Sequence, residues 1–198
     1  AGVILGYILV QVVRAGAGAR LLELGCGLGN TGVYCALAGL DVVATDVEGE
    51  LGVCRATFEA NSAGVAAAGG SWCARALDWG DPPPWALEER WSVVFGADLL
   101  YDSGVPGLSW PQDVHDDGPR HEIFVRLLSR LRFDVLILAD RERSLHVTRA
   151  FFDRLHEFGM EAHRLDTPGG GRCRRGPHAG APLTKAVDIG VWRIRRKP

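Results

Sequence analysis

The chain has 198 residues, of which 22 are Lys or Arg and 24 are Asp or Glu, and its net charge is −2. This length is that of one domain with a substantial core. A charge so close to neutral argues against bulk electrostatic binding to nucleic acid or to an acidic membrane. We therefore expect a single domain over 1–198, with neither of these as a partner.

The chain has five cysteines, an odd number, with no C-x-x-C pair and no spacing typical of a zinc site. We therefore expect no disulfide framework and no metal site. The absence of such a framework favours a reduced, intracellular compartment. We expect a monomer in the cytoplasm or the nucleus.

The first 13 residues, AGVILGYILVQVV, are apolar but lack a basic region, and Gly and Gln interrupt them. This pattern predicts a packed helix rather than a signal peptide or a membrane span. A chain that starts on such a helix with no lead-in suggests that its natural N-terminal segment is missing.

Strand and helix patterns then alternate along the chain. In chain order, the patterns predict a strand at 20–24, a helix at 31–38, a strand at 41–45, a helix at 48–61, strands at 71–77 and 91–97, a helix at 121–131, a strand at 134–139, a helix at 145–158, and strands at 160–165 and 185–195.

This alternation, with continuous apolar strands, is typical of an α/β protein whose parallel sheet is covered on both faces. The last two strands have no helix between them, which predicts an antiparallel edge of the sheet. We expect a doubly wound, mostly parallel, seven-stranded sheet with an antiparallel last strand. The irregular segments 103–120 and 167–182 are long for a compact domain and are typical of functional or disordered loops.

The stretch 21–32, LLELGCGLGNTG, is the most informative part of the chain. A short apolar run reaches Glu23, and a loop with Gly25, Gly27 and Gly29 leads into a helical pattern. Such a strand, turn and helix start brings bare backbone up to a nucleotide-like ligand. A dinucleotide fingerprint also fits Gly27-x-Gly29-x-x-Gly32, so the glycines alone leave both NAD and S-adenosylmethionine (SAM) open.

Polar features also follow the next three predicted strands: Asp46, then Asp78-Trp79, then Asp98 through Tyr101. In a parallel sheet, ligands bind across the carboxyl ends of the strands. An acid about 20 residues beyond the first glycines can accept hydrogen bonds from both hydroxyls of a ribose. Gly25 comes directly after the strand, ahead of the dinucleotide match that begins at Gly27, and this position of the first glycine favours SAM. Glu23 also favours SAM, because an acid suits a cofactor that carries a sulfonium and an ammonium.

The ordered motifs E-L-G-x-G-x-G, T-D, L-D-W and A-D-x-x-Y-D resemble the seven-β-strand protein lysine methyltransferases of methyltransferase family 16. The similarity runs from about residue 1 to residue 165 and includes an apolar strand, Arg141, and a helix with Phe151-Phe152. The resemblance implies the class I SAM-dependent methyltransferase fold, SAM as the cofactor, and a lysine side chain of a protein as the acceptor.

The resemblance also implies which residues form the site. The glycine loop would line the methionine and adenosine end of SAM, Asp46 would hold the ribose, and Trp79 would pack by the adenine. The expected cofactor-binding residues are Glu23, Gly25, Cys26, Gly27, Gly29, Asp46, Val47, Asp78, Trp79 and Ala97, and the expected catalytic residues are Asp98 and Tyr101.

The chemistry agrees with these residue types. Methyl transfer from a sulfonium is an in-line displacement, so positioning and electrostatics carry most of the catalysis. Desolvation lowers the pKa of the acceptor amine from its ordinary value of about 10.4, so no strong general base is needed. Asp98 can orient the ammonium, and the ring of Tyr101 can lie against cationic groups.

Two features depart from that family's pattern. The family's Trp just before the residues that match Ala1-Gly2 is absent, together with a longer N-terminal segment. The segment 103–120 is longer than the usual connection, and it contains acids and a Trp that suit a basic, lysine-bearing surface. We expect this acidic loop to govern substrate recognition and the basic loop 167–182 to be dispensable.

Four other functions remain open. The nearest is N-methylation of a small molecule or of another protein group, since the motifs describe the cofactor better than the acceptor. A SAM-binding scaffold without turnover is a function of another class. An NAD-dependent oxidoreductase is disfavoured by the glycine phase. A nucleic-acid methyltransferase is disfavoured because the strand that would carry its N/D-P-P-Y/F motif ends in DLLY.

Overall fold

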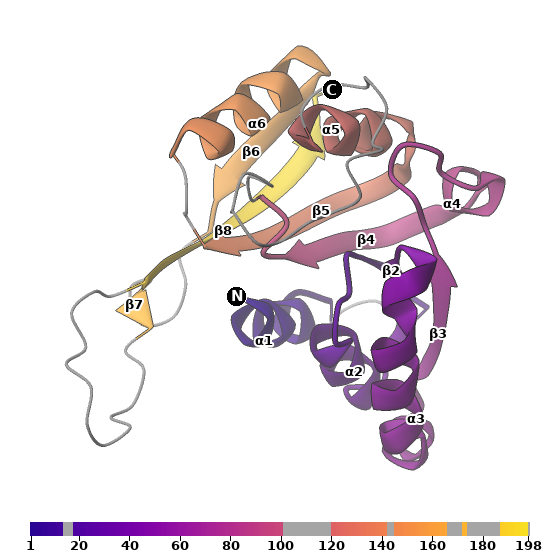
Figure 1. Ribbon diagram of the computed structural model, residues 1–198. Coiled ribbons are helices and arrows are strands. Elements are labelled where there is room, and N and C mark those ends of the chain that lie inside the picture. Colours follow the sequence, from indigo (N-terminus) through magenta and orange to yellow (C-terminus); the bar gives the residue numbers. More distant parts are fainter. Residues whose placement is uncertain (14–17, 101–119, 142–144, 166–171, 174–186, 198) are drawn as a thin grey trace.

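The computed structural model describes residues 1–13, 18–100, 120–141, 145–165, 172–173 and 187–197 (Figure 1). Its helices are α1 (Gly2–Val13), α2 (Asn30–Leu37), the 3₁₀ turn η1 (Glu48–Glu50), α3 (Leu51–Ala67), α4 (Pro84–Glu88), α5 (Arg120–Arg130) and α6 (Leu145–Glu157). Its strands are β1 (Arg20–Leu24), β2 (Asp41–Asp46), β3 (Ser71–Ala76), β4 (Arg90–Ala97), β5 (Arg132–Arg141), β6 (Met160–Arg164), β7 (Arg172–Cys173) and β8 (Val187–Arg196).

Seven of these strands form one sheet in the order β3-β2-β1-β4-β5-β8-β6, and the two-residue β7 pairs with β8 off this path. The first five strands in this order are mutually parallel, and β8 is antiparallel to both of its neighbours. The predicted doubly wound, mostly parallel, seven-stranded α/β fold with an antiparallel last strand is confirmed.

The antiparallel edge is formed by the last two long strands, and β8 is inserted between β5 and the edge strand β6. The side chains explain this order. In β8, Ile189, Val191 and Ile194 are buried, whereas in β6 only Met160 is buried. A strand with mostly polar and exposed side chains is better suited to an edge, where it discourages pairing with other chains.

Helices cover both faces of the sheet, and two apolar cores lie under them (Figure 1). One core joins the sheet to α1, α2 and α3, and the other joins it to α4, α5 and α6. Successive residues of β1 serve the two cores in turn: Leu21 points into the first, and Leu22 and Leu24 into the second. Burial on both faces accounts for the continuous apolar runs of the sequence.

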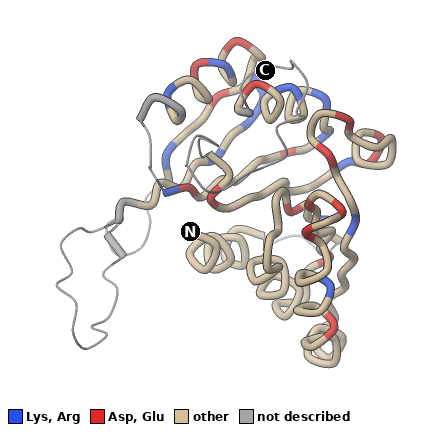
Figure 2. Tube along the Cα trace, in the orientation of Figure 1, with Lys and Arg blue, Asp and Glu red and all other residues tan. Residues whose placement is uncertain are grey.

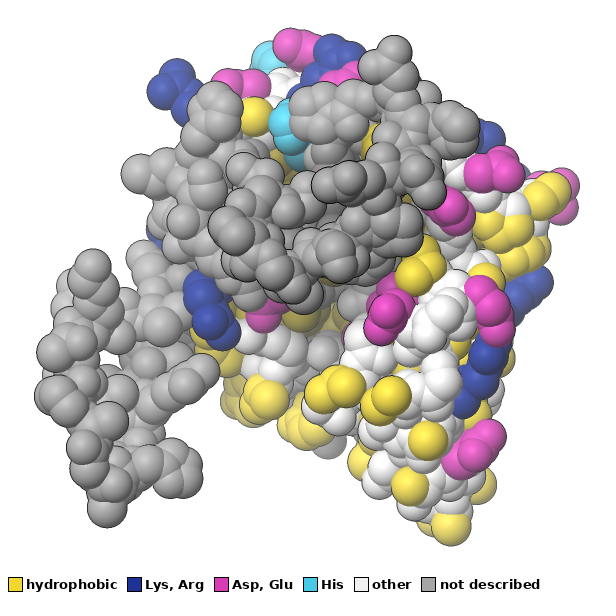
Figure 3. Space-filling model, in the orientation of Figure 1, with side chains coloured by type: hydrophobic (Ala, Val, Ile, Leu, Met, Phe, Trp, Pro, Cys, Tyr) yellow, Lys and Arg dark blue, Asp and Glu magenta, His cyan; other side chains and the backbone are white. Residues whose placement is uncertain are grey.

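The first helix packs as expected, with Leu5 and Leu9 fully buried. Neither α1 nor α2 has a charged residue, and both are uniformly tan in Figure 2. The outer face of α1 leaves Val3 and Tyr7 exposed, and Figure 3 shows hydrophobic side chains scattered over the lower part of the molecule. In the described parts of the chain, no helix is long and apolar enough to cross a membrane.

Most elements lie within a few residues of their predicted bounds, and two differ more. The helix predicted at 48–61 begins as the 3₁₀ turn η1 and continues as α3 to Ala67, because its last turns, rich in Ala and Gly, carry little apolar periodicity. The short α4 was missed, since five residues are too few for a periodic pattern. The loops 103–120 and 167–182 lie largely outside the described residues.

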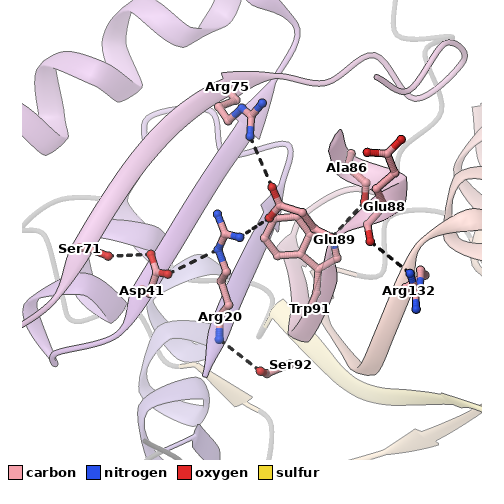
Figure 4. A network of polar contacts seen from close by, with 10 residues as sticks. All are labelled: Arg20, Asp41, Ser71, Arg75, Ala86, Glu88, Glu89, Trp91, Ser92 and Arg132. Atoms are coloured by element: carbon pink, nitrogen blue, oxygen red, sulfur yellow. Dashed lines mark hydrogen bonds and ion pairs between the residues drawn. The ribbon is translucent and has the colours of Figure 1, made fainter. Parts of the chain in front are cut away.

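The amino ends of the strands are joined by a polar network (Figure 4). Arg20 of β1 forms ion pairs with Asp41 of β2 and with Glu89, which directly precedes β4. Arg75, near the carboxyl end of β3, also pairs with Glu89. Asp41 accepts a hydrogen bond of 2.7 Å from the hydroxyl of Ser71. This network ties β1, β2 and β3 together at the end of the sheet opposite the glycine loop.

Candidate active site

The four predicted features follow four parallel strands, so they lie at the same edge of the sheet. The loop after β1 has left-handed backbone at Gly25, Gly27 and Gly29, with φ of 61°, 50° and 78°. A Cβ on Gly25 would lie 2.7 Å from Cδ2 of Leu99, whereas one on Gly27 would meet no described atom within 4 Å. The loop is therefore packed against the protein at Gly25 and open at Gly27, where a ligand can approach the backbone.

Asp46 at the end of β2 is bound to this loop. Its Oδ2 accepts a hydrogen bond of 2.9 Å from the backbone N–H of Gly27, and its Oδ1 accepts one of 2.9 Å from Val47. The N–H of Cys26 donates to the carbonyl of Thr45 at 2.9 Å. The following 3₁₀ turn has Val47 as its N-cap and receives no capping bond from a side chain. Asp46 therefore holds the loop rather than capping the next helix.

Glu23 lies behind the loop rather than on its surface, with 3% of its area exposed. Its carboxylate faces the backbone of Gly32 in α2, and its Oε2 has no hydrogen-bond partner among the described residues. Burial, and next the neighbouring Cys54, raise the pKa of Glu23 well above its ordinary value. A direct contact of Glu23 with a cofactor stays a prediction. Because Glu23 is buried behind the loop, its position favours an electrostatic effect on the cofactor over direct contact.

Trp79 stands between the glycine loop and α5. Its ring stacks on Phe124 of α5 with centroids 4.6 Å apart, and its Cζ2 lies 3.8 Å from a Cβ placed on Gly25. The preceding Asp78 is exposed and accepts a hydrogen bond of 2.8 Å from the N–H of Gly80. Trp79 therefore packs against the core and also borders the loop.

Asp98 follows β4 and Ala97, and it is the one described residue other than glycine with a left-handed φ, at 57°. Its N–H donates to Ala139 at 2.8 Å, and its side chain is 27% exposed. Its Oδ1 accepts a hydrogen bond of 3.4 Å from the N–H of Arg141, and its Oδ2 lies 3.3 Å from the nitrogen of Ala1. An unusual backbone of this kind is typical of functional sites.

The second predicted catalytic residue, Tyr101, lies outside the described residues. Leu99 and Leu100, which lead toward it, are buried, and Leu99 is the residue that packs against Gly25. The chain after Asp98 is therefore in contact with the glycine loop.

Sequence reasoning missed Asp140, the second-last residue of β5. Its side chain is 2% exposed, and its Oδ1 lies 3.4 Å from the N–H of Leu100, which donates to it. The signal was available, because Asp140 follows an apolar strand as directly as Asp46 and Asp98 do.

Two cysteines near the loop, Cys26 and Cys35, are not poised as nucleophiles. A hydrogen bond with the thiol of Cys54, and then burial, raise the pKa of Cys26 far above its ordinary value. Burial raises the pKa of Cys35 to about 12. Both thiols stay protonated at neutral pH, whereas the thiolate is the reactive form. Within the described ranges, no group of His, Cys, Asp and Glu could hold a metal ion.

Comparison with known proteins gives the family and the fold of the chain. Residues 1–118 match the lysine methyltransferase family. Magnesium protoporphyrin IX methyltransferase from Synechocystis PCC 6803, solved with bound S-adenosylhomocysteine, has 15% identity and a TM-score of 0.58, over 99% of this chain and 82% of that one. YcgJ from Bacillus subtilis has 10% identity and a TM-score of 0.62, over 98% of each chain.

The methyltransferase domain of bacterial CtHen1 has 9% identity and a TM-score of 0.65, over 97% of each chain. At such low identities these structures show the fold. The residues present fit SAM: the backbone at Gly27 is open, Asp46 lies beside it, and Trp79 borders the loop. The chain belongs to the lysine methyltransferase family, with the class I methyltransferase fold and SAM as its cofactor.

Proposed function

We propose that this protein transfers the methyl group of SAM to the side-chain nitrogen of a lysine on a protein substrate. The observation that carries this proposal is Asp98, a partly exposed carboxylate held in a left-handed backbone directly beside the glycine loop. A carboxylate at this place can bind an acceptor that arrives as a cation. The membership of the lysine methyltransferase family supports the same acceptor.

The cofactor would be held by the residues that surround the loop. The backbone of Gly25, Cys26 and Gly27 would line its methionine and adenosine end, and Asp46 would accept hydrogen bonds from the ribose hydroxyls. Val47 and Trp79 would flank the adenine. When bound, SAM supplies a methyl group on a sulfonium; a neutral amine can attack its carbon in line, with S-adenosylhomocysteine as the leaving group.

The acceptor lysine arrives protonated, with an ordinary pKa of about 10.4. Asp98 would orient the ammonium by a charge-assisted hydrogen bond. As the amine leaves water, desolvation lowers its pKa, and it gives up its proton to solvent before attack. The ring of Tyr101 would form part of the channel wall and contact the cationic group. The chain's contribution is then mainly the placement of the amine.

The substrate surface would be read by the loop 103–120, whose acids Asp113, Asp116 and Asp117 suit a basic surface. Such electrostatic steering acts mainly on association and weakens with salt. The basic loop 167–182 would be dispensable. A monomer with a protein partner, and without nucleic acid, completes the proposal.

The test is to incubate the purified protein with SAM labelled in the methyl group and with protein, RNA and small-molecule fractions of a cell lysate. Labelled protein is then hydrolysed and its amino acids are separated. We expect label in the protein fraction, recovered as methylated lysine.

A matched control is Asp134→Asn, a change at an exposed carboxylate near the other end of β5 that pairs with Arg90. It should label as the wild type does. Label only in small molecules or in RNA would overturn the lysine proposal and favour the corresponding acceptor. Binding of S-adenosylhomocysteine without label in any fraction would favour a scaffold.

A further inference from the structure

Two carboxylates at neighbouring strand ends each accept a backbone N–H from the other strand or from the turn that follows it. Asp98 follows β4, and its Oδ1 accepts the N–H of Arg141 at 3.4 Å. Asp140 lies at the end of β5, and its Oδ1 accepts the N–H of Leu100 at 3.4 Å. We call this reciprocal arrangement of Asp98 and Asp140 the carboxylate clamp.

The clamp encloses the turn at which the chain leaves the sheet. Ala97 and Ala139 are paired in the parallel register of β4 and β5, and one residue later the N–H of Asp98 bonds to the carbonyl of Ala139 at 2.8 Å. The backbone then turns through the left-handed region at Asp98. A left-handed conformation at a residue other than glycine persists only where its surroundings hold it.

The two acids differ in exposure, and the difference separates their roles. The side chain of Asp98 is 27% exposed, so an acceptor can reach it. Asp140 is 2% exposed, so it is too deeply buried to meet an acceptor protein. Asp140 accepts its hydrogen bond from the N–H of Leu100, two residues after Asp98, and Asp140 therefore acts on the turn.

We propose that Asp140 is a positioning residue for methyl transfer: by accepting the N–H of Leu100 it holds the turn that presents Asp98 to the acceptor. The inference rests on the role proposed for Asp98, and it holds for any acceptor that Asp98 orients. What Asp140 contributes is the acceptor oxygen at the turn. Its replacement by Asn keeps such an oxygen, and its replacement by Leu keeps a similar volume without one.

The experiment compares Asp140→Asn and Asp140→Leu, with Asp134→Asn and Asp134→Leu as controls on the same strand. Because small misplacements at a reacting centre are costly, we expect Asp140→Leu to lower kcat by about tenfold or more. KM for SAM and the Kd for S-adenosylhomocysteine should change less than kcat, since the hydrogen bond between Asp46 and Gly27 does not involve this turn. Asp140→Asn should keep most of the wild-type kcat, and both controls should match the wild type.

A second measurement needs no acceptor. Amide hydrogen exchange, followed by NMR, should show a protected Leu100 N–H in the wild type and in Asp140→Asn, and faster exchange in Asp140→Leu. If Asp140→Leu does not fold, Asp140→Ala removes the same oxygen with less crowding and is read in the same way.

An unprotected Leu100 N–H in the wild type, or a wild-type kcat in the variant that lacks the oxygen, would overturn the inference. Equal losses of kcat in Asp140→Asn and Asp140→Leu would also overturn it, since the retained oxygen would then not matter. If the wild type methylates no lysine but another acceptor, the lysine proposal fails, and the same kcat comparison is made with that acceptor. The exchange experiment stays decisive in either case.

Discussion

The two ends of the sheet hold their charges in different ways. At the amino ends, side chains pair with side chains: Arg20 with Asp41 and Glu89, and Ser71 with Asp41 (Figure 4). At the carboxyl ends, Asp46, Asp98 and Asp140 accept hydrogen bonds from backbone N–H groups of the turns. Strand β2 carries an acid of each kind, Asp41 at its amino end and Asp46 at its carboxyl end, so the strand itself does not impose the difference.

The comparison shows how one sheet separates stability from function. A partly exposed ion pair contributes little, about 0–1 kcal/mol, and the amino end joins several such pairs to tie strands together. A carboxylate on a turn instead fixes the turn and adds negative charge beside the glycine loop. Changes at the carboxyl end should therefore affect binding and turnover, and changes at the amino end should affect stability alone.

The largest effect is expected for Asp98→Asn. Asn tolerates the left-handed backbone and can still accept the N–H of Arg141, but it lacks the charge that would bind an ammonium. We expect turnover to fall by about 100-fold or more, with the affinity for S-adenosylhomocysteine largely kept. The measurement is methyl transfer alongside calorimetry. Wild-type turnover would show that the carboxylate charge plays no part.

A large loss is also expected for Gly25→Ala. The new Cβ would lie 2.7 Å from Leu99 at a residue with φ of 61°, so both crowding and a left-handed alanine are unfavourable. Together they should cost about 2–4 kcal/mol of unfolding free energy and weaken S-adenosylhomocysteine binding. Denaturant unfolding and calorimetry measure both. The control is Gly52→Ala in α3, where a Cβ meets no described atom within 4 Å and should not destabilise.

A smaller effect on cofactor affinity is expected at β2, where Asp46 and Asp41 lie at opposite ends of the strand. Asp46→Ala should lower the affinity for S-adenosylhomocysteine by about 1–3 kcal/mol, since the N–H of Gly27 and the ribose hydroxyls lose their acceptor. Asp41→Ala, at the other end of β2, should leave the affinity unchanged and cost at most about 1 kcal/mol of stability. Calorimetry and denaturant unfolding report the two quantities. Equal losses of affinity would remove the distinction between the two ends.

The smallest effect concerns Glu23. Burial raises the pKa of this residue in the folded state above its ordinary value of 4.5. A raised folded-state pKa means that the folded protein holds the proton more tightly. Wild-type stability therefore falls as the pH rises from 4.5 toward the folded-state pKa. Glu23→Gln has no such proton, so its unfolding free energy relative to wild type should increase as the pH rises. Denaturant unfolding at acidic and neutral pH tests this.

Glu59→Gln, at an exposed position on α3, is the matched control for Glu23→Gln. A relative stability of Glu23→Gln that does not change with pH would contradict the raised pKa.

The sequence by itself determined the local elements and the edge at which the site lies. Apolar periodicity and glycine positions depend on neighbours a few residues apart, so β1, β2, the loop at Gly25 and the helix after it were all predicted near their observed bounds. Once the strands are parallel, their carboxyl ends meet. The grouping of Asp46, Trp79 and Asp98 at one edge followed from this rule alone.

Only the tertiary structure decided how deep each acid lies and what it binds. Glu23, Asp46, Asp98 and Asp140 all stand at or just after the end of an apolar strand, yet Glu23 and Asp140 are buried while Asp98 is partly exposed. The insertion of β8 between β5 and β6 was likewise decided by packing. Strand order and side-chain depth depend on contacts between residues far apart in the chain, and no local pattern in the sequence records those contacts.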